Sequence, residues 1–464
     1  MRPPTFDAAV IGGGLSATAL AVELARRAPP GFTCALFSRA PLGPGTAYAP
    51  QSAALLMNGP VRAMSAVPGD ERHLARYLVD EADDALICRA RYGAYLRATA
   101  AAALAEHRGI SHRRAEIVDI EPAGGAYRLS ADDGTAFVAR NVVFAIGNLP
   151  PNDSFLPAAV REHPGYAGDP WSASVERFDH ARDVAILGTR LTAMDTIALL
   201  DEVAYRGRVH LISRHGLIPA IEDTSVRGLD PATLALDTAT PRALLRSLRR
   251  AAARYPGDWR AIVEALRAVT PAIWMGWNLR ERRRFLRHLQ SMWAIHRYRV
   301  PPATHGAFAR MRAEGRITIH RGRVVGAHCT SERITLAIED RRERYDVGSG
   351  YVINCTGPNA DLATVAHPLV RNAIARGLVR PDTLRLGADV TPDYRLIAAD
   401  GSTQSGLYAI GPLLRGLWYE TTAVGEIRTH ATQIVSRLLQ VAFDPARPAP
   451  ENVELTDGIA WKVS

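Results

Sequence analysis

The chain opens with an apolar segment of strand length, followed directly by a run with helical spacing. The strand covers Phe6–Ile11, the helix covers Leu15–Ala28, and a second apolar strand follows at Phe32–Ser38. A similar order returns at Asp183, and the next strand of that second unit is Val209–Ser213. Apolar strands that alternate with helices are typical of a parallel sheet covered by helices. The pattern predicts an α/β fold that contains two β-α-β units.

Further elements are predicted between and after these units. Helical spacing covers stretches near Glu71–Asp83 and Tyr92–His107, and a last helix ends at about Leu439. Asp132-Asp133-Gly134 marks a hairpin turn. Other strands are expected at Tyr127–Ser130, Thr135–Ala139, Val142–Ile146, Ile317–His320, Arg333–Ile338 and Tyr351–Asn354.

The stretch from Gly216 to Pro301 is predicted to be helical, and it is strongly basic. Thr240-Pro241 and Thr270-Pro271 have the pattern of an N-cap followed by a first-turn proline. Two interpretations fit this insertion. It forms either a wall over the reacting centre that excludes water, or an amphipathic helical subdomain with a solvated basic face. Its tryptophans are Trp259, Trp274, Trp277 and Trp293.

Composition excludes several classes of protein. The apolar fraction of 47% suffices for packed cores. No window reaches the ~18 consecutive apolar residues of a membrane span. The net charge is +9, and nearly all of the cationic residues are arginines. Lys462 is the only lysine, which disfavours a lysine Schiff base. The basic residues lack interleaved aromatic stacking motifs, so nucleic acid is not an expected partner.

The cysteines and histidines predict neither a disulfide framework nor a metal site. The four cysteines stand apart, with no Cys-x-x-Cys pair, at positions Cys34, Cys88, Cys329 and Cys355. This spacing disfavours a dithiol redox centre and indicates a cytoplasmic protein. His288 and His296 fall on one predicted helix, about 12 Å apart along its axis, too far to share an ion directly.

The first turn has the spacing Gly12-x-Gly14-x-x-Ala17 between a strand and a helix, with Ser16 inside it. Such a turn binds a dinucleotide: Gly12 allows the tight bend, Gly14 lets a pyrophosphate approach, and small Ala17 lets the helix pack closely. The acid that usually binds the adenosine ribose is replaced by Ser38-Arg39 at the end of the second strand. Either the ribose is held less tightly, or an acid from elsewhere supplies the contact.

The second turn runs Gly188-Thr-Arg190-Leu-Thr192-Ala193, so an arginine replaces one glycine. The Arg190 side chain either crowds the phosphates or contacts them as a charged donor. The following strand ends with Arg214 and no acid, which favours a 2′-phosphate and therefore NADP over NAD. The alternative is a solvated arginine at a strand end. Two such turns suggest two dinucleotides that exchange electrons.

The chain resembles flavoproteins that bind two dinucleotides, and most closely the bacterial FAD/NAD(P)-binding family called YdhS-like. The segments that carry this resemblance are Val10–Ala17, Pro41–Tyr48, Leu55–Pro60, Met64-Ser65, Phe285–Arg297 and Gly411–Gly416. Weaker similarity extends to flavin-dependent N-hydroxylating and Baeyer–Villiger monooxygenases. The resemblance implies two Rossmann-like domains. Residues 1–178 and 350–464 would form the FAD domain, and residues 179–349 the NAD(P)H domain, with the helical insertion at 216–301.

The resemblance also implies site residues. The chain would leave the FAD domain at a turn containing Gly147 and return at one containing Gly357. The Gly411 turn would lie beside the flavin, although Pro412 stands where many flavoproteins have an acid. Asn58 and Met64 would contact the cofactor, Asn58 being equally a loop-capping residue. Glu420 and Trp418 would line the flavin or the substrate, Trp418 being equally a core-packing residue.

The implied reaction is hydride transfer from NADPH to FAD, then oxygenation of a small substrate by a flavin hydroperoxide. An amine of an amino-acid-like metabolite is the first choice of substrate, with O2 as co-substrate and a homodimer as the default assembly. A flavin dehydrogenase or reductase would share every motif. A non-catalytic FAD-binding protein would also retain the first turn, and Arg190 favours it modestly.

Overall fold

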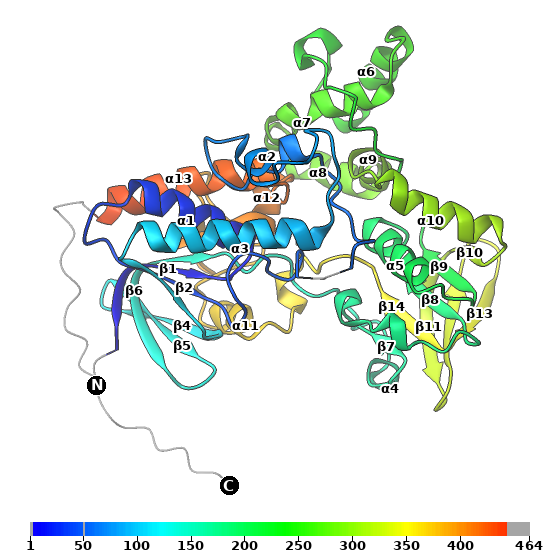
Figure 1. Cartoon of the computed structure of the whole chain (residues 1–464), viewed down its shortest axis with the longest axis horizontal. Helices are drawn as coiled ribbons and strands as arrows, with labels where there is room; N and C mark the ends of the chain where they lie inside the picture. Colours follow the sequence, from blue (N-terminus) through cyan, green and yellow to red (C-terminus); the bar gives the residue numbers. More distant parts are fainter. Residues whose placement is uncertain (1–2, 50–51, 443–464) are drawn as a thin grey trace.

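A computed structural model describes residues 3–49 and 52–442 of the chain. Lys462 and the end of the expected FAD domain, residues 443–464, lie outside these ranges. Two sheets with parallel central strands, each with its own helices, lie side by side, and a helical insertion projects from their junction (Figure 1). The fold is therefore α/β, as predicted. None of the described helices is long and apolar enough to cross a membrane.

The first sheet has the order β15-β16-β6-β1-β2-β3, with the antiparallel pair β4 and β5 attached to β6. The neighbours of β1 run parallel to it, and Ile11 lies opposite both Phe37 and Phe144. The carboxyl ends of these strands therefore meet at one edge. The strands are β1 Thr5–Ile11, β2 Cys34–Phe37, β3 Ile110–Arg113, β4 Ile117–Ala123, β5 Ala126–Ala131, β6 Ala136–Phe144, β15 Arg395–Ile397 and β16 Thr403–Ala409.

The second sheet repeats this plan in the order β10-β9-β8-β14-β7, with every described pairing parallel. Its central strand is β8, and Leu187 lies opposite both Ile212 and Asn354. A three-stranded antiparallel sheet, β11-β12-β13, comes before β14 along the chain. In the first domain, β4 and β5 come before the end of β6 in the same way. The strands are β7 Tyr166–Ala167, β8 Val184–Leu187, β9 Val209–Ser213, β10 Ile317–Arg321, β11 Arg323–Cys329, β12 Ile334–Glu339, β13 Arg344–Ser349 and β14 Tyr351–Asn354.

Helices α1, α3 and α13 cover one side of the first sheet (Figure 1). Helix α1 is rich in alanine and nearly all of it is buried, because it packs between the sheet and two helices. Its last turn carries Arg26 and Arg27, which stabilise the negative end of the helix dipole. In the second domain α5 follows β8 and packs against α10. The bounds are α1 Leu15–Arg27, α2 His73–Tyr77, α3 Arg89–Glu106, α4 Ala158–Arg161, α5 Leu191–Glu202, α10 Pro302–Ala313, α11 Pro368–Ala375, α12 Arg415–Trp418 and α13 Val424–Ala442.

The insertion consists of α6 Pro241–Arg254, α7 Trp259–Gly276, α8 Leu279–His288 and α9 Gln290–Arg297. Thr240 caps α6 as predicted, since its hydroxyl accepts a hydrogen bond from the Ala243 amide. The insertion contacts the first domain through the Trp274 indole, which donates to the carbonyl of Gly416 at 3.0 Å. Short 3-10 turns lie at Val61–Ala63, Pro170–Ser172, Val175–Arg177, Pro231–Leu234, Leu362–Thr364 and Gly411–Leu414.

Several sequence predictions about elements are wrong in detail. Thr270-Pro271 does not start a helix but lies inside α7, because buried residues from Ala261 to Trp274 continue one apolar stripe through it. His288 and His296 do not share a helix, since the chain bends at Leu289 between α8 and α9. The helix near Glu71–Asp83 shortens to α2, and Val79 beyond it has a positive φ of 36°.

One further correction concerns the strands Thr135–Ala139 and Val142–Ile146, which form the single strand β6. Its first part pairs with β5 and its second part with β16, while β1 pairs along nearly its whole length. The polar Asn141 between the two apolar runs is buried, and its amide donates to the Asp7 carbonyl at 3.0 Å.

Candidate functional site

The first glycine turn lies where β1 ends and α1 begins. Gly12 has φ +126°, and a Cβ there would lie 2.1 Å from the carbonyl oxygen of Ala145, which follows β6. Only glycine fits this approach. A Cβ on Gly411 would lie 3.1 Å from the Ser16 hydroxyl, so the C-terminal turn reaches the start of α1. Ala17 is fully buried against the sheet, as the motif predicts.

The glycines next to Gly12 contact two other loops. A Cβ on Gly13 would collide with the Ser38 side chain at 2.5 Å, and a Cβ on Gly14 would lie 3.5 Å from Cα of Gly45. The loop 41–48 therefore crosses close to the turn, a contact that the sequence did not predict. The turn, the end of β2, this loop and the Gly411 turn together form one edge of the first domain.

The second turn repeats the geometry of the first. Gly188 has φ +124°, and a Cβ there would lie 2.3 Å from the carbonyl oxygen of Cys355, which follows β14. Gly12 and Gly188 therefore have the same relation to the end of a neighbouring parallel strand, β6 in the first sheet and β14 in the second. Thr189 connects this turn to the end of β9, because its hydroxyl lies 3.0 Å from that of Ser213. The Gly188 turn is therefore a structural repeat of the first, as its sequence indicates.

A cavity of about 580 Å³ opens over the second turn. Its volume is in the range of small-molecule and cofactor sites. It brings together five of the residues predicted to bind the second nucleotide, namely Gly188, Arg190, Thr192, Arg214 and Gly357. His215 and Arg323 also line it, and the sequence analysis missed both. Desolvation and the nearby cations Arg214, Arg321, Arg190 and Arg341 lower the pKa of His215, so the cavity has a positive potential suited to phosphate.

Arg190 does not distort the turn in which it replaces glycine. Its φ of −95° is open to any residue, and it occupies the N-cap position of α5. Its side chain lines the cavity over the second turn, where desolvation and the cations Arg415 and Arg214 lower its pKa. The guanidinium is therefore available to an anion in this cavity.

At the end of β2, the two residues predicted to lie at the ribose, Ser38 and Arg39, have protein partners. The Ser38 hydroxyl donates to the carbonyl of Ala40 at 2.7 Å and lies 3.0 Å from His112 Nε2. Arg39 turns away to form ion pairs with Asp132 and Glu116. Both side chains are thus engaged with protein groups at this edge.

Four buried side-chain polar atoms in the C-terminal segment of the first domain have no protein hydrogen-bond partner. They are Trp418 Nε1, Thr421 Oγ1, Arg428 Nη1 and His430 Nδ1. Burial lowers the pKa of His430 to about 4, so the ring is neutral at pH 7. Buried polar groups normally have hydrogen-bond partners. Four orphans in thirteen residues therefore fit a polar ligand next to the Gly411 turn, such as a flavin. Sequence reasoning missed Thr421, Arg428 and His430.

Glu420 lies in this segment, and its carboxylate is already hydrogen-bonded to an arginine. Its carboxylate accepts hydrogen bonds from Arg297 of α9, with Nη2 at 2.9 Å and Nε at 3.1 Å. The two side chains are 3% and 9% exposed, so the pair is buried between the insertion and the first domain. No spacing rule would have found this pair, because the residues are 123 positions apart.

Three other predicted residues, Asn58, Met64 and Gly147, do not line the cavity over the second turn. Asn58 is exposed, and Met64 is half-buried with its carbonyl accepting a 2.8 Å hydrogen bond from the Tyr92 hydroxyl. Gly147 has φ +69°, and a Cβ there would meet no atom within 4 Å. Its turn follows Ala145, so the chain leaves the first domain beside Gly12.

A buried ion pair connects the two domains beside the second turn. Arg89, the first residue of α3, lies 2.7 Å from the carboxylate of Asp195 in α5. Its guanidinium also lies over the Trp171 ring at 5.1 Å. The helix that follows the second turn is therefore attached to the first domain.

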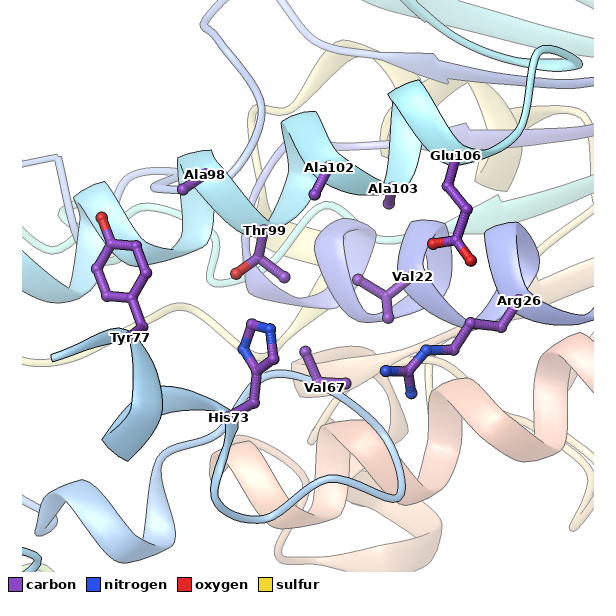
Figure 2. A pocket seen from close by; sticks show the side chains of 10 residues that line it. All are labelled: Val22, Arg26, Val67, His73, Tyr77, Ala98, Thr99, Ala102, Ala103 and Glu106. Atoms are coloured by element: carbon purple, nitrogen blue, oxygen red, sulfur yellow. The ribbon is translucent and has the colours of Figure 1, made fainter. Parts of the chain in front are cut away.

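A separate groove of about 260 Å³ lies between α1, α3 and the segment around α2 (Figure 2). Its walls include Ala98, Ala102 and Ala103 of α3 and Val22 of α1. It contains none of the predicted site residues and lies away from both glycine turns, so we do not assign it to the site.

A family model described as FAD-NAD(P)-binding matches residues 9–149. No curated protein matches the chain. Among solved structures, ornithine N-hydroxylase of Kutzneria sp. 744, in complex with reduced FAD, NADP+ and L-ornithine, has TM-score 0.65 and 18% identity. The match covers 94% of this chain and 100% of that one. The cadaverine monooxygenase of Erwinia amylovora has TM-score 0.62 and 13% identity, with 99% and 100% covered. Thioredoxin reductase of T. acidophilum has TM-score 0.54 and 13% identity, with 95% and 99% covered. At these identities the chain shares the fold of flavoproteins with two nucleotide-binding domains.

Proposed function

We propose that the protein is an FAD-dependent, NADPH-consuming monooxygenase that oxygenates a small amine. The observation that carries this proposal is the repeated turn. Gly12 and Gly188 have the same backbone geometry in two adjacent domains, and a cationic cavity lies over the second turn. The likeness to ornithine and cadaverine monooxygenases supports oxygenation of an amine.

In this proposal FAD binds at the first turn, between Gly12, Gly14, Ser16, Ala17 and the Gly411 turn. The four orphaned polar atoms of Trp418, Thr421, Arg428 and His430 would supply hydrogen bonds to it. Bound FAD accepts hydride from NADPH and passes electrons to oxygen. The protein would orient the two nucleotides, and the buried Arg297–Glu420 pair would close the insertion side of the site to water.

NADPH binds in the second cavity. Its pyrophosphate would lie at the turn of Gly188 and Thr192, at the N-terminus of α5, where amide groups favour negative charge. Arg214, with Arg323 and His215 in the same cavity, would hold the 2′-phosphate. Arg190 lines this same cavity, so it would assist the binding of the second nucleotide rather than block it. This argues against the non-catalytic alternative.

A disulfide reductase is disfavoured by the cysteines. All four are free, and burial raises the pKa of both Cys34 and Cys355 to about 12. Such thiols are poor nucleophiles and do not form a redox pair. A flavin reductase that uses another acceptor stays as the second candidate, supported by the likeness to thioredoxin reductase.

The finer assignments belong to the same proposal. We assign the chain to the YdhS-like family, place it in the cytoplasm, and expect a homodimer. The domain division follows the two sheets, with residues 1–178 and 350–464 binding FAD and 179–349 binding NADPH. Strand β16, from the later segment, pairs with β6, from the earlier segment, in one sheet. This pairing supports an FAD domain built from two separate segments of the chain.

The experiment that tests the function is anaerobic mixing of the FAD-loaded protein with NADPH, and then with oxygen. Rapid bleaching of the flavin absorbance, much faster with NADPH than with NADH, supports the two-nucleotide site. Oxygen uptake coupled to hydroxylated product in the presence of an amine supports the monooxygenase. Bleaching with uncoupled reoxidation for every amine tested would favour the reductase. No bleaching by either nucleotide would refute the proposal.

A further inference from the structure

The helical insertion carries a surface of exposed, unpaired arginines, which we call the arginine patch. Its members lie on α6 and α8 and are Arg242, Arg246, Arg249, Arg250, Arg254, Arg280, Arg283 and Arg287. None of them forms an ion pair or a side-chain hydrogen bond with another residue that the structure describes. The positive charge of the patch is therefore available to a partner outside the chain.

The arginines of α6 lie on one side of that helix. Arg242, Arg246 and Arg250 follow one another at intervals of four residues, so their side chains lie one above the other. The opposite side packs into the interior of the insertion through Leu244 and Leu248. Packing of the apolar side therefore holds the row of arginines toward solvent.

Helix α8 repeats this arrangement. Arg280, Arg283 and Arg287 are three and four residues apart, while Phe285 on the other side is buried. Helices α6 and α8 contact each other, so the two rows belong to one part of the insertion. This part projects from the junction of the two domains (Figure 1).

Acidic side chains do not neutralise the patch. The sequence between Asp237 and Asp258 contains no acid, and Asp258 itself pairs with Arg260 at 2.8 Å. Glu281, the one acid of α8, pairs with Arg284 at 2.6 Å. An array of like charges without counterions favours a partner that presents many negative charges over a broad surface.

The shape and chemistry of the patch distinguish among such partners. Neither of the two cavities described above is lined by residues of α6 or α8, so the patch has no pocket for the anchor side chains of a partner protein. Helix α6 contains no aromatic residue, and the one aromatic of α8, Phe285, is buried. The patch therefore has no platform on which nucleic-acid bases stack. A bilayer of anionic lipids requires neither feature, because its phosphates are spread over a plane.

Exposed apolar side chains accompany the arginines. Leu279, the first residue of α8, is exposed and lies one turn from Arg283 on the same side of the helix. Met275 of α7 and Met292 of α9 are also exposed. Apolar side chains beside a basic surface are typical of elements that lie at the headgroup level of a membrane.

We propose that the arginine patch attaches the insertion to the surface of a bilayer that contains anionic phospholipids. The guanidinium groups would bind the lipid phosphates, a geometry that suits their paired N–H donors. Leu279 would enter the layer just below the phosphates. This inference goes beyond the proposed function and does not depend on it.

The test is sedimentation of the full-length, FAD-loaded protein with lipid vesicles. Vesicles of phosphatidylglycerol and phosphatidylcholine in equal parts are compared with vesicles of phosphatidylcholine alone. We expect the protein to sediment only with the anionic vesicles. The bound fraction should fall steeply between about 0.05 and about 0.5 M NaCl, because salt screens exposed charges.

A variant without the α6 row tests the role of the patch. It combines Arg242→Gln, Arg246→Gln, Arg249→Gln and Arg250→Gln, since glutamine and arginine have similar helix propensities. Each arginine near an anionic surface contributes about fivefold to affinity, so this variant should bind the anionic vesicles roughly a hundred- to a thousandfold more weakly. A second variant, which combines Arg280→Gln, Arg283→Gln and Arg287→Gln, tests the α8 row in the same way.

The matched control removes four exposed arginines outside the insertion. It combines Arg97→Gln, Arg108→Gln, Arg177→Gln and Arg371→Gln. These arginines also have no ion pair with a described residue, and the control loses the same net charge as the α6 variant. It should bind the anionic vesicles as the wild type does. Flavin content and circular dichroism should be unchanged in all three variants.

Two results would overturn the inference directly. One is failure of the wild type to sediment with the anionic vesicles at low salt. The other is an equal loss of binding in the α6 variant and the control, because the overall charge and not the patch would then be responsible. Poly-L-glutamate and a short DNA duplex are tested as alternative polyanions. Binding of either one to the patch without binding to vesicles would replace the membrane by an acidic protein or a nucleic acid. Vesicle binding needs no NADPH, so its outcome is independent of whether NADPH reduces the flavin.

Discussion

Arg297 and Glu420 form a buried ion pair that joins the helical insertion to the last segment of the first domain. Two nitrogens of the guanidinium donate to the carboxylate, at 2.9 and 3.1 Å. Arg267 and Glu426 repeat the connection between α7 and α13 at 3.2 Å. The insertion is thus attached to the first domain by two ion pairs and by the Trp274 indole. This arrangement favours the interpretation of the insertion as a wall over the site.

Removal of one member of the Arg297–Glu420 pair should destabilise the protein strongly. Glu420→Gln leaves a buried guanidinium without its counterion, and such a change costs roughly 3–5 kcal/mol. We expect a lower free energy of unfolding in urea and faster loss of bound FAD. The double variant Arg297→Met with Glu420→Leu removes both charges and should recover much of the stability. A single variant as stable as the wild type would contradict the buried pair.

Gly12→Ala should abolish FAD binding, because the new Cβ would meet the Ala145 carbonyl oxygen at 2.1 Å. The matched control is Gly134→Ala in the β5–β6 hairpin. Gly134 also has a positive φ, +83°, but a Cβ there meets no atom within 4 Å. The control should lose only about 1–2 kcal/mol of stability from backbone strain and keep its flavin. The measurement is the flavin-to-protein absorbance ratio of the purified variants, and equal ratios would show that the close approach is unimportant.

Arg214→Ala should weaken NADPH binding about ten- to a hundredfold by removing one charge-assisted contact, and leave NADH unaffected. The reason is that only NADPH carries the 2′-phosphate that Arg214 would hold. The measurement is the rate of anaerobic flavin reduction as a function of each nucleotide's concentration. Arg323→Ala, in the same cavity, tests whether the phosphate has a second cation. Equal losses with both nucleotides would instead place Arg214 near a group that they share.

The sequence predicted the two turns well because each depends on contiguous residues. Each turn is recognised from a run of six residues that begins at Gly12 or Gly188. In the structure both glycines have the same backbone conformation. The contacts that complete the candidate site are different in kind. Arg297 and Glu420, or Gly14 and Gly45, meet only after the chain has folded, and neither spacing nor composition brings them together.

The errors in the predicted elements also have physical causes. Pro271 ordinarily begins a helix, but burial of an apolar stripe in α7 outweighs the lost hydrogen bond. The break at Leu289 has no strong local signal in the sequence. Asn141 interrupts an apolar run, yet β6 continues through it because the side chain finds a buried acceptor on Asp7. In each case tertiary contacts override a local preference.

Burial of His430 should make the protein less stable in acid. Burial lowers the pKa of His430 to about 4, below its usual 6.5, so the folded protein resists a proton that the unfolded chain accepts. Stability from this group is complete above pH 6.5 and falls as the pH drops toward 4, by about 1.4 kcal/mol per pH unit. The variant His430→Leu should show a flatter dependence of the free energy of unfolding between pH 6.5 and pH 4. His288→Leu, an exposed histidine on α8, is the control and should keep the wild-type slope. A slope unchanged in His430→Leu would mean that the ring is already charged in the folded protein.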